Sequence, residues 1–214
     1  MVSMAFDYKK EYKEFYFPKN KPSIIEIPKM NFIAVRGKGD PNDNNGEYQQ
    51  ALSILYSLAF TLKMSYKGDY KINGYYPYVV PPLEGFWWME DCTKIDYAHK
   101  EKFQWISIIR LPDFISEEDF IWAKKEVTSK KRIDCSNAEF LNYEEGLCVQ
   151  CMHLGPYDNE IETIEQMENY AKEQGYEIDI TNTRFHHEIY LSDPRRCAPE
   201  RLRTIIRHPI KKSV

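Results

Sequence analysis

Two loops of similar composition, one in each half of the chain, constrain the fold more than any other feature of the sequence. The first contains Gly37 and Asp40, and the second contains Gly155 and Asp158. The glycine and the aspartate of the first loop match those of the second at the same offset along the chain. Each loop follows an extended apolar segment and leads into a helical pattern, so we interpret the two halves as copies of one unit.

Hydrophobic periodicity assigns the elements around these loops. Apolar residues recur at spacings of three and four over residues 47–64, which predicts a helix. Further helices are predicted over residues 116–130, where Ser116 suits the N-cap, and over residues 161–174. Extended segments are predicted over residues 23–35, 75–80, 83–89, 102–111, 147–154, 186–191 and 203–207.

This order of elements predicts the fold class. It runs β-α-β-β, a connecting helix, then β-α-β-β again, which indicates an α+β fold built from a duplicated unit with pseudo-two-fold symmetry. Such halves would leave a central ligand cleft between them, a common place for a small-molecule site. We expect a single domain over residues 23–210, preceded by an N-terminal arm over residues 1–22.

Composition narrows the class of protein. The chain has 214 residues, of which 43% are hydrophobic, and its formal net charge is -4. Binding to nucleic acid is not expected, because it depends on a basic excess. The apolar run at residues 51–62 is too short to span a membrane, and no signal peptide is recognised. An odd number of cysteines, five, argues against a disulfide framework, so we expect a cytoplasmic protein.

An aromatic cluster at residues 75–88 is the first candidate for a binding site. Its prolines place it at a sheet edge or rim. Four members are candidate ligand-binding residues: Tyr76, Phe86, Trp87 and Trp88. They could form the wall of a pocket or pack in the core, and the sequence leaves both readings open.

A second candidate lies on the strand predicted at residues 186–191. Alternate side chains of a strand share a face, so His186, Glu188 and Tyr190 are expected together on one side. Glu188 could act there as a general base or as the counter-charge of a cationic ligand. Tyr157, in the second loop, could donate a hydrogen bond to a ligand oxygen. The alternative is an exposed strand face with solvated polar groups.

Metal and cofactor sites are not predicted. Cys148 and Cys151 fall within a predicted strand, where their side chains point to opposite faces, and His186 and His187 diverge for the same reason. A phosphate-binding loop and a dinucleotide-binding fingerprint are both absent from the sequence. We therefore expect neither a metal ion nor an organic cofactor.

The chain resembles the GyrI-like small-molecule-binding family, the effector-binding fold of AraC- and MerR-type multidrug regulators. The resemblance rests on residues 81–88, 153–158 and 187–196, and with residues 198–207 it covers about 23–210. It implies a lipophilic, often cationic ligand held beside Glu188, and it adds His153 to the candidate ligand-binding residues. With no helix-turn-helix before the domain, direct transcriptional control is not expected.

The Leu-Glu-Gly-aromatic-Trp-Trp segment resembles a stand-alone branch that includes hydrolases of cyclopropane-bearing genotoxic compounds. That resemblance implies that Glu188 activates or orients water, that Tyr157 binds the polar end of the substrate, and that Trp87, Trp88 and Tyr190 stack on its rings. Two alternatives stay open: a drug-sequestering or sensing protein without turnover, and a gyrase-protecting interaction protein. A homo-oligomer is compatible with the sequence.

Overall fold

The computed structural model describes residues 5–90 and 96–213, so Cys92 and the first residues of the predicted arm lie outside the described part. The chain begins with two short helices, α1 (Tyr8–Glu11) and α2 (Lys13–Tyr16). Two further sets of elements then follow in the same order. The first set is β1 (Ser23–Lys38), α3 (Glu47–Met64), β2 (Leu83–Met89) and β3 (Phe103–Arg110), and α4 (Glu117–Lys131) connects it to the second.

The second set consists of β4 (Ala138–Leu154), α5 (Ile161–Glu173), β5 (Tyr176–Ile178), β6 (His186–Tyr190) and β7 (Arg203–Lys212). Short 3₁₀ turns also occur: η1 (Ser65–Lys67), η2 (Tyr97–Lys102), η3 (Tyr157–Asn159) and η4 (Pro199–Arg201). The predicted α+β class is confirmed. Duplication of the chain stays a prediction, although each set holds strand, helix and two antiparallel strands in one order.

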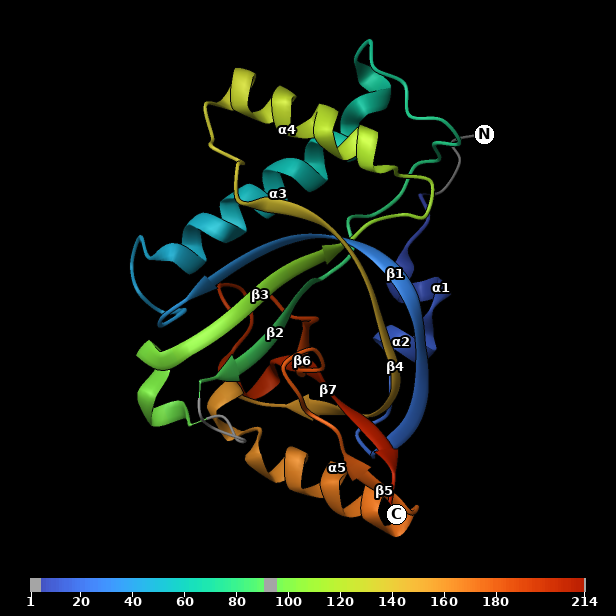
Figure 1. The fold of residues 1–214 in the computed structure, drawn as a ribbon, viewed down its shortest axis with the longest axis vertical. Helices are drawn as coiled ribbons and strands as arrows, with labels where there is room; N and C mark the ends of the chain where they lie inside the picture. Colours follow the sequence, from blue (N-terminus) through green and yellow to red (C-terminus); the bar gives the residue numbers. More distant parts are fainter. Residues whose placement is uncertain (1–4, 91–95, 214) are drawn as a thin grey trace.

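The strands form a closed antiparallel barrel. Hydrogen-bonded neighbours run β4-β1-β3-β2-β6-β7, and β7 pairs with β4 to close the ring, while the short β5 extends the sheet beside β7. Strands β1 and β4 pair over most of their lengths and curve together around one side of the barrel (Figure 1). Helices α3 and α4 lie above the barrel in this view and α5 lies below it.

The helices form where the periodicity predicts them. The buried face of α3 carries Leu55, Leu58 and Leu62, which pack in the same core as side chains of β1 and β3. Helix α4 begins with a capping box, in which the Ser116 and Asp119 side chains each accept from the other residue's backbone N–H. None of the described helices is long and apolar enough to cross a membrane.

One predicted strand is absent. Residues 75–80 form only an isolated bridge between Tyr78 and Phe6, outside the named strands. The physical reason is Pro77, which has no backbone N–H to donate to a ladder. Its carbonyl instead accepts a hydrogen bond from the Phe6 backbone, so this segment packs against the N-terminal residues.

Charged side chains fill part of the barrel interior. Glu145 on β4 accepts a hydrogen bond from Arg207 Nη1 at 3.0 Å and lies 3.1 Å from His187 Nδ1. On the other side of the imidazole, Glu84 lies 3.0 Å from His187 Nε2. Beside them is a cavity of about 10 Å³, which has room for about one water molecule.

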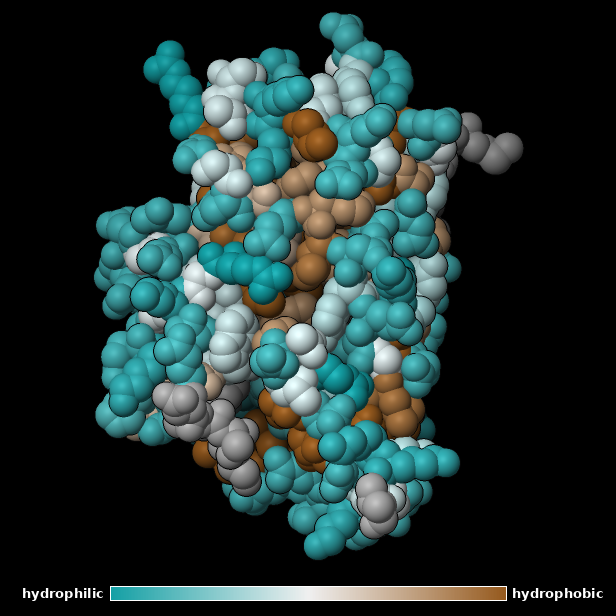
Figure 2. Space-filling view, viewed as in Figure 1, coloured by the Kyte–Doolittle hydropathy of each residue, from teal (hydrophilic) through white to brown (hydrophobic). Residues whose placement is uncertain are grey.

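This interior network is electrically compensated. Burial acts to raise the pKa of Glu145, but His187 and Arg207 outweigh it and lower that pKa to about 2. Burial acts to lower the pKa of His187, but the flanking carboxylates outweigh it and raise that pKa above the usual value. The face of the molecule in Figure 2 is mostly hydrophilic, with hydrophobic residues in a band down its middle.

We expect Glu145→Gln to destabilise the fold by about 3–5 kcal/mol near neutral pH, because it leaves buried cations without their anion. The pKa of Glu145 is depressed on folding, so its contribution is complete above the unfolded value and disappears as pH falls toward about 2. Urea unfolding over this pH range measures the effect. The exposed Glu139→Gln, which removes a surface pair with Arg36, should cost less than about 1 kcal/mol.

Candidate functional site

Strand β6 carries the candidate site on its face opposite to the interior network. Alternation along the strand places His186, Glu188 and Tyr190 on one side and His187 and Ile189 on the other. In the register with β2, Glu188 lies across from Gly85, and His186 lies across from Trp87. The predicted face is therefore formed, and β2 supplies its neighbouring side chains.

Aromatic rings from four elements close over this face. Trp87 Nε1 donates a hydrogen bond to the Tyr190 hydroxyl at 2.8 Å. The Tyr48 ring of α3 lies 5.5 Å from that of Trp87, and the Tyr157 ring of η3 meets Tyr190 edge-on at 5.6 Å. As a result Glu188 is only 6% exposed. A planar ligand must therefore displace at least one of these rings to reach the carboxylate.

A glycine makes the close approach of these rings possible. A Cβ at residue 85 would lie 2.7 Å from Trp87 Nε1 and 3.3 Å from the Tyr190 hydroxyl. Both distances are shorter than ordinary van der Waals contact. Gly85 therefore allows the hydrogen-bonded Trp87–Tyr190 pair to lie directly against the backbone of β2.

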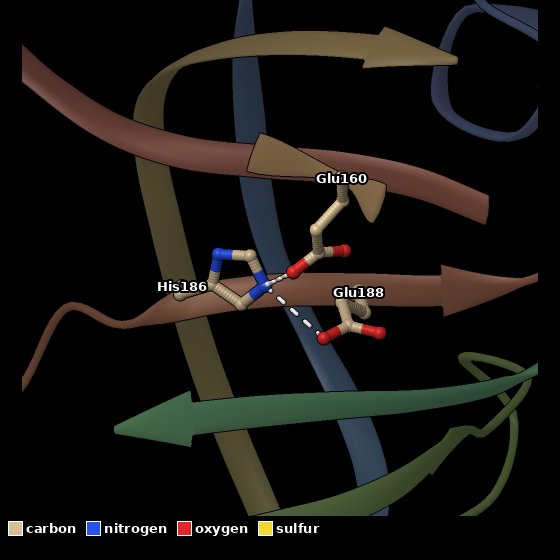
Figure 3. A group of neighbouring side chains, drawn as sticks. All are labelled: Glu160, His186 and Glu188. Atoms are coloured by element: carbon tan, nitrogen blue, oxygen red, sulfur yellow. Dashed lines mark hydrogen bonds and ion pairs between the residues drawn. The ribbon is translucent and has the colours of Figure 1, made fainter. Parts of the chain in front are cut away.

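A chain of buried polar groups leads to Glu188. His208 on β7 lies with Nε2 2.7 Å from His186 Nδ1. His186 Nε2 in turn lies 3.1 Å from Glu188 Oε1 (Figure 3). His208 is neutral, because burial first and His186 second hold its pKa well below the usual value. Its Nδ1 is buried without a partner. An unpaired buried N–H is rarer than an unpaired acceptor, so we place the hydrogen on Nε2.

This assignment fixes the direction of the chain. With His208 donating to His186 Nδ1, His186 carries a hydrogen on Nε2 and donates it to Glu188. Glu160, at the N-cap of α5, also approaches, with Oε1 3.4 Å from the same Nε2 (Figure 3). One carboxyl oxygen of Glu160, one ring nitrogen of His186 and one carboxyl oxygen of Glu188 lie within 4.8 Å of one another, a spacing that one cation could bridge. Because His186 Nε2 bears a hydrogen, we interpret the cluster as a hydrogen-bond relay.

The hydroxyl groups around Glu188 remain protonated near neutral pH. Burial, followed by the charge of Glu188, raises the pKa of Tyr157 to about 12. The same two causes raise the pKa values of Tyr48 and Tyr190. These phenols can therefore donate hydrogen bonds to a ligand, while the carboxylate can only accept.

Comparison with known proteins places this geometry in a family. The model of the GyrI-like small molecule binding domain matches residues 20–211, nearly the whole chain. The chain belongs to the GyrI-like family. None of the curated proteins compared with it matches.

Solved structures similar to this chain include proteins from Listeria innocua. A protein described as a hydrolase is 45% identical, with a TM-score of 0.88, and the match covers 96% of this chain and 100% of that one. An uncharacterized conserved protein from the same organism is 46% identical, with a TM-score of 0.90 and the same coverage. The C-terminal domain of EcmrR is 14% identical to this chain, with a TM-score of 0.55. The match covers 90% of this chain and 98% of that domain, and the two share the fold.

The fold brings five of the predicted site residues together: Tyr157, Trp87, His186, Glu188 and Tyr190. It places Phe86 and Trp88 on the other face of β2. Phe86 packs 4.4 Å from the ring of His187, and Trp88 lies 4.8 Å from that of Phe185.

Two other predicted residues also have partners away from Glu188. Tyr76 is 39% exposed and its ring meets Phe6 and Phe114. His153 is held by its own loop, with Nδ1 2.9 Å from Thr163 Oγ1 and Nε2 3.0 Å from the Pro156 carbonyl. This pair of contacts positions the loop that carries Tyr157. No ligand role of these residues is tested by the structure, and all remain predictions.

The sequence reasoning missed Glu160, Tyr48 and His208. Glu160 and Tyr48 both lie at the beginnings of helices that follow the two matching loops. Their approach to Glu188 depends on how these helices pack against the barrel, which no local pattern in the sequence reveals. The role of His208 likewise depends on the register of β6 with β7.

We expect Gly85→Ala to push apart the Trp87–Tyr190 pair and to destabilise the protein by about 1–3 kcal/mol, the usual range for overpacking. Urea unfolding measures this change. Gly68→Ala is the matched control, since its nearest atom is 3.7 Å from the added Cβ. Equal stability of the two variants would show that the pair is not held against the backbone.

Proposed function

We propose that this GyrI-like protein binds a flat, apolar small molecule on the Glu188 face and opens a cyclopropane ring in it by adding water. One observation carries the proposal: a carboxylate that hydrogen-bonds to His186 and to the Tyr190 hydroxyl lies beneath a lid of aromatic rings. Rings of this kind stack on planar ligands, and the buried carboxylate provides one strong acceptor for a water proton.

Each side chain has a defined part in this reaction. Glu188 takes a proton from water while the water oxygen bonds to a ring carbon. The strained carbon–carbon bond breaks, and its electron pair moves into the conjugated carbonyl of the substrate. Tyr157 donates a hydrogen bond to that carbonyl oxygen. The product then takes up a proton from solvent, and Glu188 releases the proton that it took from water, which completes the addition and restores the base. Trp87 and Tyr190 hold the planar rings in place, so orientation supplies much of the rate.

The similarity to solved structures supports turnover without naming a substrate. A relative from Listeria innocua that is 45% identical over almost all of both chains is described as a hydrolase. Hydrolysis by Glu188 needs only water as co-reactant, in keeping with that description. The substrate class proposed here rests on the aromatic lid and on the sequence resemblance.

A second function, sequestration of a lipophilic cation without turnover, is favoured by one observation. Glu188 lies among the rings of Tyr48, Tyr157 and Tyr190, whose pKa values it perturbs. A carboxylate surrounded by aromatic faces suits a desolvated cation, because both attract positive charge.

Incubation with a planar cyclopropane-bearing alkylator, followed by mass spectrometry for a water adduct, tests the proposal. We expect multiple turnovers from the wild type and a loss of about 10²–10⁴ in rate for Glu188→Gln, the usual contribution of a general base. Glu162→Gln, an exposed carboxylate on α5, should leave the rate unchanged.

Three outcomes separate the functions. Product formed at equal rates by wild type and Glu188→Gln would contradict the role of Glu188. Tight binding of the alkylator without any adduct would contradict turnover and support sequestration. Binding of a lipophilic cation that weakens in Glu188→Gln would identify the carboxylate as its counter-charge.

A further inference from the structure

Glu160 is a buried carboxyl group that the proposed reaction does not yet use. It is 0% exposed, and neither of its carboxyl oxygens has a hydrogen-bond partner. Its side chain points from the start of α5 toward His186 and Glu188 (Figure 3). A charged carboxylate in such surroundings loses its hydration without replacement, which is costly unless the charge is compensated.

The pair of Glu160 and Glu188 has too few donors for two negative charges. His186 supplies one N–H, and Glu188 at 3.1 Å receives it in preference to Glu160 at 3.4 Å. The Tyr190 hydroxyl also hydrogen-bonds to Glu188, so neither donor serves Glu160. His208 behind it is neutral, and the described residues around the pair include no lysine or arginine recorded in an ion pair with either carboxyl group.

The barrel interior provides the contrast. There, Glu84 and Glu145 also lie close to one histidine, but His187 and Arg207 contribute positive charge. The Glu160 pair lacks such cations, and two carboxylates that share one site cannot both ionise without compensation.

We propose that Glu160 and Glu188 hold one proton between them at neutral pH, that Glu160 carries it, and that Glu160 thereby positions Glu188 as the single charged base of the site. Burial, and then the charge of Glu188, raises the pKa of Glu160 well above the usual value. The N-terminus of α5 favours the charged form, but this effect is modest.

Among the described residues, the other titratable groups that face the pair come from four elements. On β6 these groups are His186 and Tyr190, on β7 His208, on η3 Tyr157 and on α3 Tyr48. The tyrosine pKa values are all raised, so none of these hydroxyls contributes a charge near neutral pH.

This inference gives Glu160 a role in the proposed reaction, and that role rests on the proposed function. A neutral Glu160 leaves one negative charge next to the substrate, held by the hydrogen from His186. When Glu160 ionises at higher pH, the site holds two buried negative charges. The second charge destabilises the folded site and weakens its binding of a neutral ligand. Glu160 acts through Glu188, so it is a positioning residue.

Urea unfolding of the wild type and Glu160→Gln between about pH 5 and pH 8 tests the proton directly, without a substrate. The folded wild type keeps a proton that the unfolded chain releases above its ordinary carboxyl pKa. Wild-type stability therefore falls with rising pH relative to the glutamine variant. The ratio of their unfolding constants should change by up to about tenfold per pH unit. His187 and His208 titrate in both proteins and cancel.

The control Glu162→Gln, on the exposed side of α5, should show a ratio independent of pH. A pH-independent ratio for Glu160→Gln, whatever its size, would overturn the proposal. A ratio that changes when EDTA is added would also overturn it, because a bound cation would then compensate the pair in place of a proton.

Two further measurements keep the inference separate from folding and from catalysis. The infrared spectrum of the wild type near neutral pH should contain the carbonyl band of an un-ionised carboxylic acid, and its absence would contradict the inference. If ring opening occurs, Glu160→Gln should lose the alkaline limb of the pH–rate profile and keep its acid limb. A titrating pair without ring opening would contradict the proposed function alone.

Discussion

The alternation of side chains along β6 is the constraint on which the site depends. His187 points into the barrel, where Glu84 and Glu145 hold it from both sides, and this fixes the rotation of the strand about its axis. His186 and Glu188 must then point to the opposite face, beneath the aromatic lid. A shift of one residue in register would exchange the two faces and destroy both networks. The charge-balanced network around His187 in the barrel interior thus positions the side chains of the Glu188 face.

Much of the fold could be predicted from periodicity, and the exceptions have local causes. Helix α3 matches the predicted residues 47–64 because its apolar face repeats without interruption. Strand β4 begins at Ala138, well before the predicted residue 147, because its first half pairs with β1 through polar and aromatic residues that show no apolar run. Closure of the barrel by β4 and β7 depends on pairing between distant segments, which no local pattern reveals.

The candidate site could be predicted only in part, because it too depends on contacts between segments that are distant in the sequence. A single strand pattern was enough to group His186, Glu188 and Tyr190. The aromatic cluster was compatible with a pocket wall or with core packing, and alternation along β2 divides it by sending Trp87 to the site and Phe86 into the interior. Glu84, on the same strand as Trp87, contacts His187 on the interior face. Glu160 comes from a helix start, and only the packing of α5 against the barrel shows that it meets Glu188.

A crystal structure with a bound planar cyclopropane-bearing compound, or its ring-opened product, tests the central claim most directly. The account predicts that the ligand lies among Trp87, Tyr157 and Tyr190, with the reacting carbon facing Glu188 and at least one aromatic ring moved aside. A ligand found instead in the groove of about 460 Å³ beside Tyr70 and Trp122, with the rings over Glu188 unmoved, would contradict it.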